Sequence, residues 1–198
     1  MNIERAIEKF ESHGFDVSFF NSGEEAARHI AARCAGKTVG IGGSVTAQQL
    51  SLYDRLSENG EVYSHQRTPD AKTYAAAAGA QVYICSANAL SETGEIVNID
   101  GRGNRVSAML FGHERLIIVA GVNKLTPDLD SAVFRARNIA SPLNARRLGR
   151  KTPCAMGAEP RCYDCSSPER ICRGFVVMTN PMMGMACELV LVNEELGY

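Results

Sequence analysis

The segment from Lys37 to Leu50 constrains the fold more than any other part of the chain. It begins as a short apolar strand, passes through a turn at Gly42 and Gly43, and continues as a helix. Glycine at this junction indicates a tight bend or a close approach of a ligand to the backbone. A short strand that leads through a glycine turn into a helix is typical of α/β proteins.

Two hydroxyl side chains, Ser44 and Thr46, stand at the start of that helix. The first turn of a helix presents N–H groups and a partial positive charge, which together attract anions. This predicts a phosphate or carboxylate site, and the alternative is a plain turn in which Ser44 serves as an N-cap. Because the segment matches neither a Walker loop nor a GxGxxG fingerprint, it does not by itself indicate a nucleotide cofactor, and a hydroxy acid, a sugar phosphate or a CoA pyrophosphate are the anions considered.

Strands and helices alternate along the rest of the chain. Strands are expected at Phe15–Phe20, Thr38–Ile41, Glu61–Ser64, Gln81–Ser86, Glu95–Ile99, Arg115–Ala120, Phe175–Met178 and Glu188–Val192, of which the last two could pair as a hairpin. Helices are expected from Ile3 to Gly14, after Ser22, from the glycine turn to near Asn59–Gly60, at Thr73–Gly79, Arg105–Phe111 and Leu129–Ala140, and after Pro142. Ser22 and Glu25 have the spacing of a capping box. The alternation predicts an open, largely parallel sheet with helices on both faces.

Length and charge narrow the class of protein. The 198 residues fit a single domain spanning 1–198, and the net charge of -1 gives no reason to expect nucleic acid as a partner. No apolar run is long enough for a membrane span. The first fourteen residues mix charged and apolar side chains at helical spacing, so we expect no signal peptide and a cytoplasmic protein.

Polar residues follow several of the predicted strands. In an open parallel sheet, a ligand binds beyond the carboxyl ends of the strands. The glycine turn, Asn88, the turn that begins at Asp100, and the pair Asn123 and Lys124 all stand at such ends. We therefore predict that these segments meet around one site that binds a small anionic metabolite.

The turn from Asp100 carries the densest set of charged and amide groups, and its members are Asn98, Asp100, Arg102, Asn104 and Arg105. An arginine there could bind an acidic substrate while Asp100 accepts a proton. The alternative is a turn that satisfies itself, with Asp100 bonded to backbone amides and its arginines in solvent.

Four further side chains could contribute to the site. Lys124 could bring a second positive charge to the same site. Asn144 and Arg147 could also contribute, although a place on a helix surface is an equal alternative. His65 could be an acid, a base or a ligand, but a histidine in a solvated loop is the expectation.

The seven cysteines fall into two groups. Three stand alone and are expected to be small buried hydrophobes: Cys34, Cys85 and Cys187. Four are crowded into the proline-rich segment from Lys151 to Gly174, which is expected to be irregular: Cys154, Cys162, Cys165 and Cys172. Their C-x7-C-x2-C-x6-C spacing suits a structural zinc ion or a [4Fe–4S] cluster, and a disulfide pair or unligated thiols are the alternatives.

Four stretches of the chain resemble the LUD-domain family, named for lactate utilisation, and within it the lactate-utilisation protein C type. They are GGSVT, SANALSETGEIVNIDGRGNRV, GVNKLTPDLDSAVFRARNIASPLNARRL and TPC…CYDCSSPERIC, and the likeness continues to the terminal EELGY. The resemblance implies a Rossmann-like three-layer fold of the NagB/RpiA/CoA-transferase kind with an added C-terminal segment. It also implies a role beside iron–sulfur proteins that oxidise L-lactate to pyruvate, with no reaction assigned to this subunit type by itself.

The wider relatives of that fold suggest a second hypothesis. GIGGSVT resembles the loop with which sugar-phosphate isomerases bind phosphate. CoA-transferases of this fold use a glutamate near a Ser-Glu-X-Gly sequence, which Ser91 to Gly94 match, so Glu92 could be a nucleophile or merely a solvated turn residue. We therefore weigh an accessory subunit of an iron–sulfur system against a stand-alone enzyme, which needs Glu92 or Asp100 beside Ser44, and against a ligand-binding scaffold.

Overall fold

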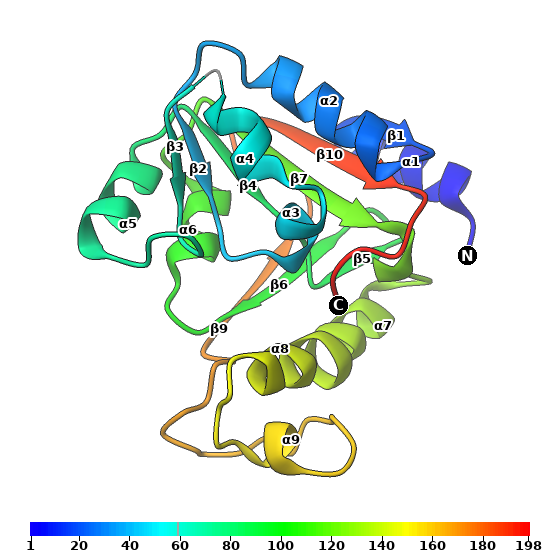
Figure 1. Ribbon diagram of the computed structural model, residues 1–198. Coiled ribbons are helices and arrows are strands. Elements are labelled where there is room, and N and C mark those ends of the chain that lie inside the picture. Colours follow the sequence, from blue (N-terminus) through cyan, green and yellow to red (C-terminus); the bar gives the residue numbers. More distant parts are fainter. Residues whose placement is uncertain (59) are drawn as a thin grey trace.

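Six parallel strands form the main sheet of the computed structural model, which describes residues 1–58 and 60–198 (Figure 1). Their order across the sheet is β1, β10, β7, β4, β2, β3. The strands are β1 (Asp16–Phe20), β2 (Val39–Ile41), β3 (Val62–Ser64), β4 (Val82–Cys85), β7 (Arg115–Gly121) and β10 (Ala186–Val192). The main sheet therefore agrees with the predicted α/β class.

A smaller four-stranded sheet lies against the main one. Its order is β8 (Leu125–Thr126), β5 (Ala89–Ser91), β6 (Ile96–Asp100) and β9 (Gly174–Met178). The expected hairpin of the last two strands is wrong, because β9 pairs with β6 while β10 lies between β1 and β7. The reason is burial: every residue of β10 after Ala186 is buried, so this strand needs neighbours on both sides.

Nine α-helices are described, and most begin at a side chain that caps them. They are α1 (Ile3–Ser12), α2 (Gly23–Arg33), α3 (Val45–Gln49), α4 (Leu52–Ser57), α5 (Ala71–Ala78), α6 (Asn104–Leu110), α7 (Leu129–Arg135), α8 (Ser141–Arg147) and α9 (Pro153–Met156). A π-helical turn at Ala136–Ala140 joins α7 to α8. The capping box of Ser22 and Glu25 is confirmed.

The helix expected after the glycine turn is in fact two helices. Ser51 adopts a φ of 51°, in the left-handed region, which separates α3 from α4. The end of that helix was expected near Asn59–Gly60, and Asn59 lies outside the described residues, while α4 ends at Ser57.

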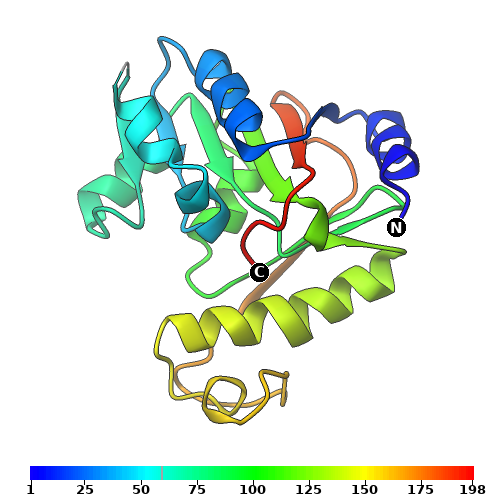
Figure 2. The same ribbon diagram turned by 45° about the vertical axis from the view of Figure 1, so that its right-hand side comes forward.

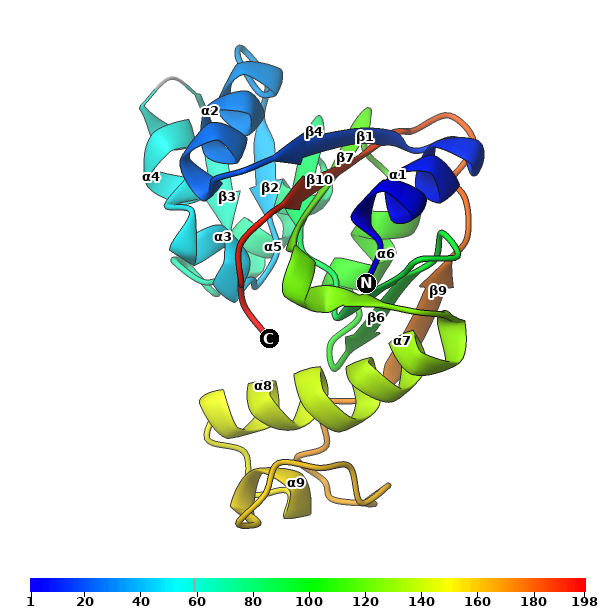
Figure 3. The ribbon, with the colours of Figure 1, turned by 90° about the vertical axis from the view of Figure 1, so that its right-hand side faces the viewer.

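Alternate residues of the central strands face two different cores. Ile117 and Val119 of β7 pack with α2, α3 and α4, whereas Leu116 and Ile118 pack with α1, α6 and the small sheet. A third cluster holds α7 and the π-helical turn on the far face of the small sheet, through Val97 of β6. Figures 2 and 3 show the resulting order: helices, main sheet, small sheet, then the long α7–α8 helix.

The cysteine-rich segment lies beyond α8, on the side away from the main sheet (Figures 2 and 3). Its predicted irregularity holds except for the single turn of α9, which starts at Pro153, where proline fits the first helical position. No helix within residues 1–58 and 60–198 is long and apolar enough to cross a membrane.

Candidate functional site

Two neighbouring cavities open at the carboxyl ends of the main-sheet strands. The larger, here called the outer cavity, has a volume of about 780 Å³, and the smaller, here called the inner pocket, has about 50 Å³. Both are lined by Gly43, Asn88, Arg105, Asn144 and Arg147. Segments that are distant in the sequence therefore meet beside Gly43.

The two glycines of the turn have different reasons to be glycine. A Cβ atom on Gly42 would lie 2.8 Å from the hydroxyl of Tyr83, which is too close. A Cβ atom on Gly43 would meet nothing within 4 Å, because this residue borders both cavities. Gly42 thus permits packing against β4, and Gly43 contributes bare backbone to the cavity wall.

Ser44 caps its own helix. Its Oγ atom accepts a hydrogen bond from the N–H of Ala47 at 3.1 Å, and its own N–H donates to Gln66 Oε1 at 3.2 Å. Ser44 also lines the inner pocket, but α3 is only five residues long. The strongest positive charge in the pocket therefore comes from side chains of other segments.

Lys124 is the buried cation of the inner pocket. The residue lies in the 3-10 turn that directly follows β7, and it is only 3% exposed. The Nζ atom donates to Thr46 Oγ1 at 3.1 Å and to Ser86 Oγ at 2.8 Å. Within the described residues no carboxylate forms an ion pair with it.

The two hydroxyl groups beside Lys124 form a chain of hydrogen bonds in which each hydroxyl donates away from the amine. Ser86 Oγ donates to Thr46 Oγ1 at 3.2 Å, and Thr46 Oγ1 donates to the carbonyl of Leu196 at 3.3 Å. Both hydroxyls are thus acceptors toward Lys124. Burial, together with the nearby positive charges of Arg135 and Arg105, lowers the pKa of Lys124 to about 7.

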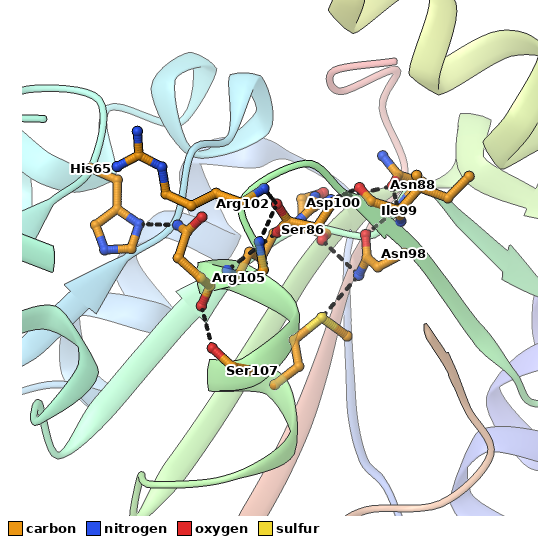
Figure 4. A network of polar contacts seen from close by, with 12 residues as sticks. His65, Ser86, Asn88, Asn98, Ile99, Asp100, Arg102, Arg105 and Ser107 are labelled. Carbon is orange, nitrogen blue, oxygen red and sulfur yellow. Dashed lines mark hydrogen bonds and ion pairs between the residues drawn. The ribbon is translucent and has the colours of Figure 1, made fainter. Parts of the chain in front are cut away.

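The turn at Asp100 is closed by its own carboxylate (Figure 4). The two oxygens accept the backbone N–H groups of Arg102, Gly103 and Arg105 at 3.1 to 3.2 Å. The Nε atom of Arg105 lies 3.6 Å from Asp100 Oδ2. This is the self-satisfied turn of the two alternatives, although Asp100 does line the outer cavity.

The two arginines of this turn have different surroundings. Arg102 is exposed, and its guanidinium lies 4.5 Å from the centre of the Tyr74 ring. Arg105 is partly buried and donates to the carbonyl of Ile99 at 2.6 Å and to Asn88 Oδ1 at 3.3 Å. Arg105 is thereby fixed between the outer cavity and the inner pocket.

Besides Asn144, two of the predicted asparagines line a cavity, and Asn88 does so at the boundary of both. Its Oδ1 atom accepts the N–H of Ile99 at 2.7 Å, which ties the end of β4 to β6. Asn104 lines the outer cavity, and its Nδ2 atom donates to Nδ1 of His65 at 2.7 Å.

The other two asparagines, Asn98 and Asn123, do not line either cavity. Asn98 is fully buried, and its side chain bonds to the N–H of Asn88 at 3.0 Å and to the carbonyl of Ser86 at 3.2 Å. Asn123 Oδ1 accepts the N–H of Leu196 at 3.1 Å. These two residues position the site without lining it.

The expectation of a solvated His65 is wrong. The residue is 7% exposed and lines the outer cavity, with its ring 4.6 Å from that of Tyr74. Burial lowers the pKa of His65, and the charge of Asp100 opposes this shift. His65 directly follows β3, so its place at a strand end was a signal in the sequence.

Glu92 lies outside both cavities. Its Oε1 atom accepts the N–H of Asn2 at 2.8 Å, and the residue is 6% exposed in the turn between β5 and β6. It is therefore neither beside Ser44 nor solvated. The structure does not bring this predicted nucleophile to the site.

Several lining residues were missed or weighed only lightly from the sequence. No sequence pattern marks Ser86 as a site residue, although it directly follows β4 at the same edge of the sheet. Arg147 was weighed, and α8 carries it to both cavities. The outer cavity also receives Arg150, Arg170 and Arg173, which no local pattern assigns to a site because α8 and the cysteine-rich segment reach it only through tertiary packing.

The four clustered cysteines face one small cavity of about 20 Å³. Each is partly buried and carries a free thiol. The backbone N–H of Asp164, a residue with a φ of 46°, points at Cys162 Sγ at 3.4 Å. In the part of the chain that the structure describes, no three Cys, His, Asp or Glu side chains are already spaced as metal ligands. The donor set fits a soft metal, but its sulfur atoms would have to draw together around it.

The three single cysteines are buried, as predicted. Burial raises the pKa of Cys34 and of Cys85 to about 12 and also raises that of Cys187. Thiols in this state are poor nucleophiles, so these residues serve packing.

Comparisons with known proteins give one matching family model and one similar fold. The family model described as LUD domain matches residues 3–191. Among solved structures, a DUF162 family protein from Deinococcus radiodurans is similar in fold, with a TM-score of 0.58 and 13% sequence identity over 97% of this chain and 96% of that one. No curated protein matches the chain.

Proposed function

Because this chain belongs to the LUD domain family, we propose that it binds the carboxylate of a 2-hydroxy acid in the inner pocket. We further propose that it serves as an accessory subunit of a cytoplasmic iron–sulfur system that oxidises L-lactate or a related acid. Kinship with the NagB/RpiA/CoA-transferase fold is part of the same proposal. The observation that carries it is the buried amine of Lys124, which has hydroxyl partners but no described carboxylate partner.

An anion would complete the surroundings of Lys124. Burying an ammonium group without a counter-charge is costly. A charged Nζ has three N–H groups, and two of them donate to Ser86 and Thr46. The third is left for a carboxylate oxygen in the pocket, and a bound carboxylate would raise the pKa of Lys124 back toward its ordinary value.

Two guanidinium groups line the same pocket and would hold the other carboxylate oxygen. Arg105 is fixed by its bonds to Ile99 and Asn88, so it is pre-oriented. Arg147 is exposed on α8 and can reorient when a ligand enters. Charge-assisted hydrogen bonds of this kind are among the stronger ones that proteins make with carboxylates.

The stand-alone transferase or isomerase is the weaker candidate. It needs a carboxylate beside Ser44, but Glu92 bonds to Asn2 and Asp100 closes its own turn. A scaffold that binds the anion without chemistry is compatible with the same contacts. We therefore restrict the proposal for this chain to binding.

We also propose that Cys154, Cys162, Cys165 and Cys172 hold a zinc ion or a [4Fe–4S] cluster. All four line one cavity, and an amide N–H directed at Cys162 Sγ is the contact that stabilises a metal-bound thiolate. Zinc would fix the segment in place, whereas a cluster would supply electron transfer to an iron–sulfur partner.

Calorimetric titration of the purified chain tests the binding proposal. L-lactate and pyruvate are titrated into the wild type, into Lys124→Met, and into the control Lys72→Met, which changes an exposed lysine on α5. We expect binding to the wild type and the control and none to Lys124→Met. Absence of binding to the wild type, or equal binding to both variants, would contradict the proposal. Co-purification with an iron–sulfur protein tests the subunit role.

A further inference from the structure

The wall of the outer cavity is strongly basic. Eight charged side chains other than His65 line it, and six of them are arginines: Arg102, Arg105, Arg147, Arg150, Arg170 and Arg173. The two acidic residues are Asp100 and Glu169. Since the whole chain has a net charge of -1, this excess of positive charge is local to the cavity.

The two carboxylates pair with no more than one of these six arginines. Asp100 accepts backbone N–H groups of its own turn, and Glu169 Oε2 accepts the N–H of Lys151 at 2.9 Å. Asp100 has an ion-pair contact with Arg105 alone, at 3.6 Å.

Some of these arginines are bonded to the backbone of the cavity wall, and others are free to bind a ligand. Arg170 and Arg173 donate to backbone carbonyls of the cysteine-rich segment. Arg102, Arg147 and Arg150 are exposed, come from two sides of the cavity, and form no ion pair within the described residues. Three guanidinium groups without counter-charges thus face one space.

The size of the outer cavity exceeds what the proposed function needs. At about 780 Å³ it lies in the range of cavities that take drug-sized ligands, whereas lactate has only six heavy atoms and would place its carboxylate in the inner pocket of about 50 Å³. Lys124 lines the inner pocket and does not line the outer cavity. The outer cavity therefore has room for a second, larger and more highly charged molecule.

We propose that the outer cavity binds a metabolite that carries a diphosphate group and is about the size of a nucleoside diphosphate. Arg102 and Arg150, which line the outer cavity alone, bind its phosphate oxygens, because the planar guanidinium donates two parallel N–H groups to such oxygens. Arg105, which lines both spaces, connects this molecule to the carboxylate in the inner pocket.

A small molecule suits the cavity better than a polynucleotide. The turn after β6, helix α8 and the segment from Pro168 to Arg173 bound the space on different sides. A polynucleotide backbone binds along an extended basic surface, whereas these arginines are gathered around one cavity.

Calorimetry with ADP, inorganic pyrophosphate and a single-stranded oligonucleotide tests the proposal. The variants are the double substitution Arg102→Gln with Arg150→Gln, and the control Arg28→Gln, an exposed arginine on α2 far from the cavity. We expect ADP and pyrophosphate to bind the wild type and the control equally. The double variant should bind both at least about tenfold more weakly, since it loses two charge-assisted contacts.

Three outcomes would overturn the proposal: no binding of ADP or pyrophosphate to the wild type, the same weakening in the control as in the double variant, or tighter binding of the oligonucleotide than of ADP. The Lys124→Met variant separates this proposal from the previous one. It should lose L-lactate binding while ADP binding stays within about twofold of wild type, because Lys124 is outside the outer cavity. If the wild type binds L-lactate but not ADP, only the carboxylate site of the inner pocket is supported. If it binds ADP but not L-lactate, only the diphosphate site of the outer cavity is supported.

Discussion

Ser86 Oγ lies 2.8 Å from Lys124 Nζ, although the two residues are 38 positions apart. Ser86 directly follows β4, and Lys124 ends the 3-10 turn after β7. These strands are neighbours and run parallel, so their carboxyl ends reach the same edge of the main sheet. The contact places an amine where a ligand of an open α/β sheet binds.

Replacing Lys124 by methionine should stabilise the protein. Its pKa of about 7 shows that the folded chain disfavours the charged amine, which the unfolded chain accommodates. Methionine fills similar space without a charge, so the free energy of unfolding at pH 6 should rise by on the order of 1 kcal/mol, or about 2–4 °C in Tm.

The pH dependence of the stability gained by Lys124→Met is a sharper test of the burial of this lysine. Between pH 7 and the ordinary pKa of lysine, the unfolded chain binds a proton that the folded chain has lost, so wild-type stability rises with pH over that window. The gain from Lys124→Met should therefore be largest at pH 6 and shrink by pH 9. Urea unfolding at the two pH values measures it, and parallel profiles for the two proteins would contradict the assigned burial.

Carboxylate binding in the inner pocket should weaken as the pH rises above 7. The anion prefers the charged form of Lys124, so its binding constant should fall by up to about tenfold for each pH unit above the pKa of the free protein. Binding near pH 7.5 should also take up protons. Calorimetry in buffers of different ionisation enthalpy measures that uptake, and a pH-independent constant would exclude Lys124 as the partner.

Substituting Asp100 by alanine should unfold the turn after β6. The carboxylate accepts three backbone N–H groups, and their loss should cost about 1–3 kcal/mol. Asp54→Ala is the matched control, because Asp54 is exposed and pairs with Arg67 at the surface. Urea denaturation compares the two, and a control that is as destabilised as Asp100→Ala would show that the turn bonds contribute little.

Glu188 is a buried carboxylate of the fold rather than of the site. It is 1% exposed and bonds to His29 at 2.6 Å, to Ser18 at 2.9 Å and to Arg33 at 3.1 Å. Burial by itself raises the pKa of Glu188, but these partners outweigh it and hold the pKa below its ordinary value. The charged form therefore stabilises the fold at neutral pH, and that contribution is lost as the pH falls through the folded pKa.

Glu188→Gln should consequently destabilise the protein by about 3–5 kcal/mol at pH 7, because Arg33 and Arg115 lose their counter-charge. The difference from wild type should narrow in acid, where the wild-type carboxylate is itself protonated. Guanidinium unfolding at pH 7 and at about pH 3, well below the ordinary pKa of glutamate, measures both values. An equal difference at the two pH values would mean that the charge of Glu188 does not matter.

Removing one thiol of the cysteine-rich segment tests the proposed metal centre. Elemental analysis of the purified wild type should find zinc or iron, and Cys162→Ser should lose it because one of four ligands is gone. Cys34→Ala, a buried cysteine elsewhere, should keep the metal. Full metal content in Cys162→Ser would exclude a site of these four thiolates.

Local sequence patterns were sufficient for much of the fold. The strand and glycine turn before Ser44, the capping box at Ser22, and the apolar run of β7 depend on residues that are near one another in the chain. The meeting of several polar segments at one edge of the sheet could also be predicted, because the carboxyl ends of parallel strands lie at the same edge. Asn88 and Lys124 were placed at the site on that ground alone.

Only the tertiary structure decided which of these side chains face the cavities. The chain could have paired β9 with β10, but burial of β10 on both faces drew it between β1 and β7. Glu92 has the sequence context of a nucleophile, yet the fold turns it toward Asn2. Arg147 and Arg150 reach the outer cavity because α8 packs beside it. The periodicity of a sequence fixes which face of an element is apolar, whereas the direction of a polar side chain depends on partners that are distant in the chain and meet only when it folds.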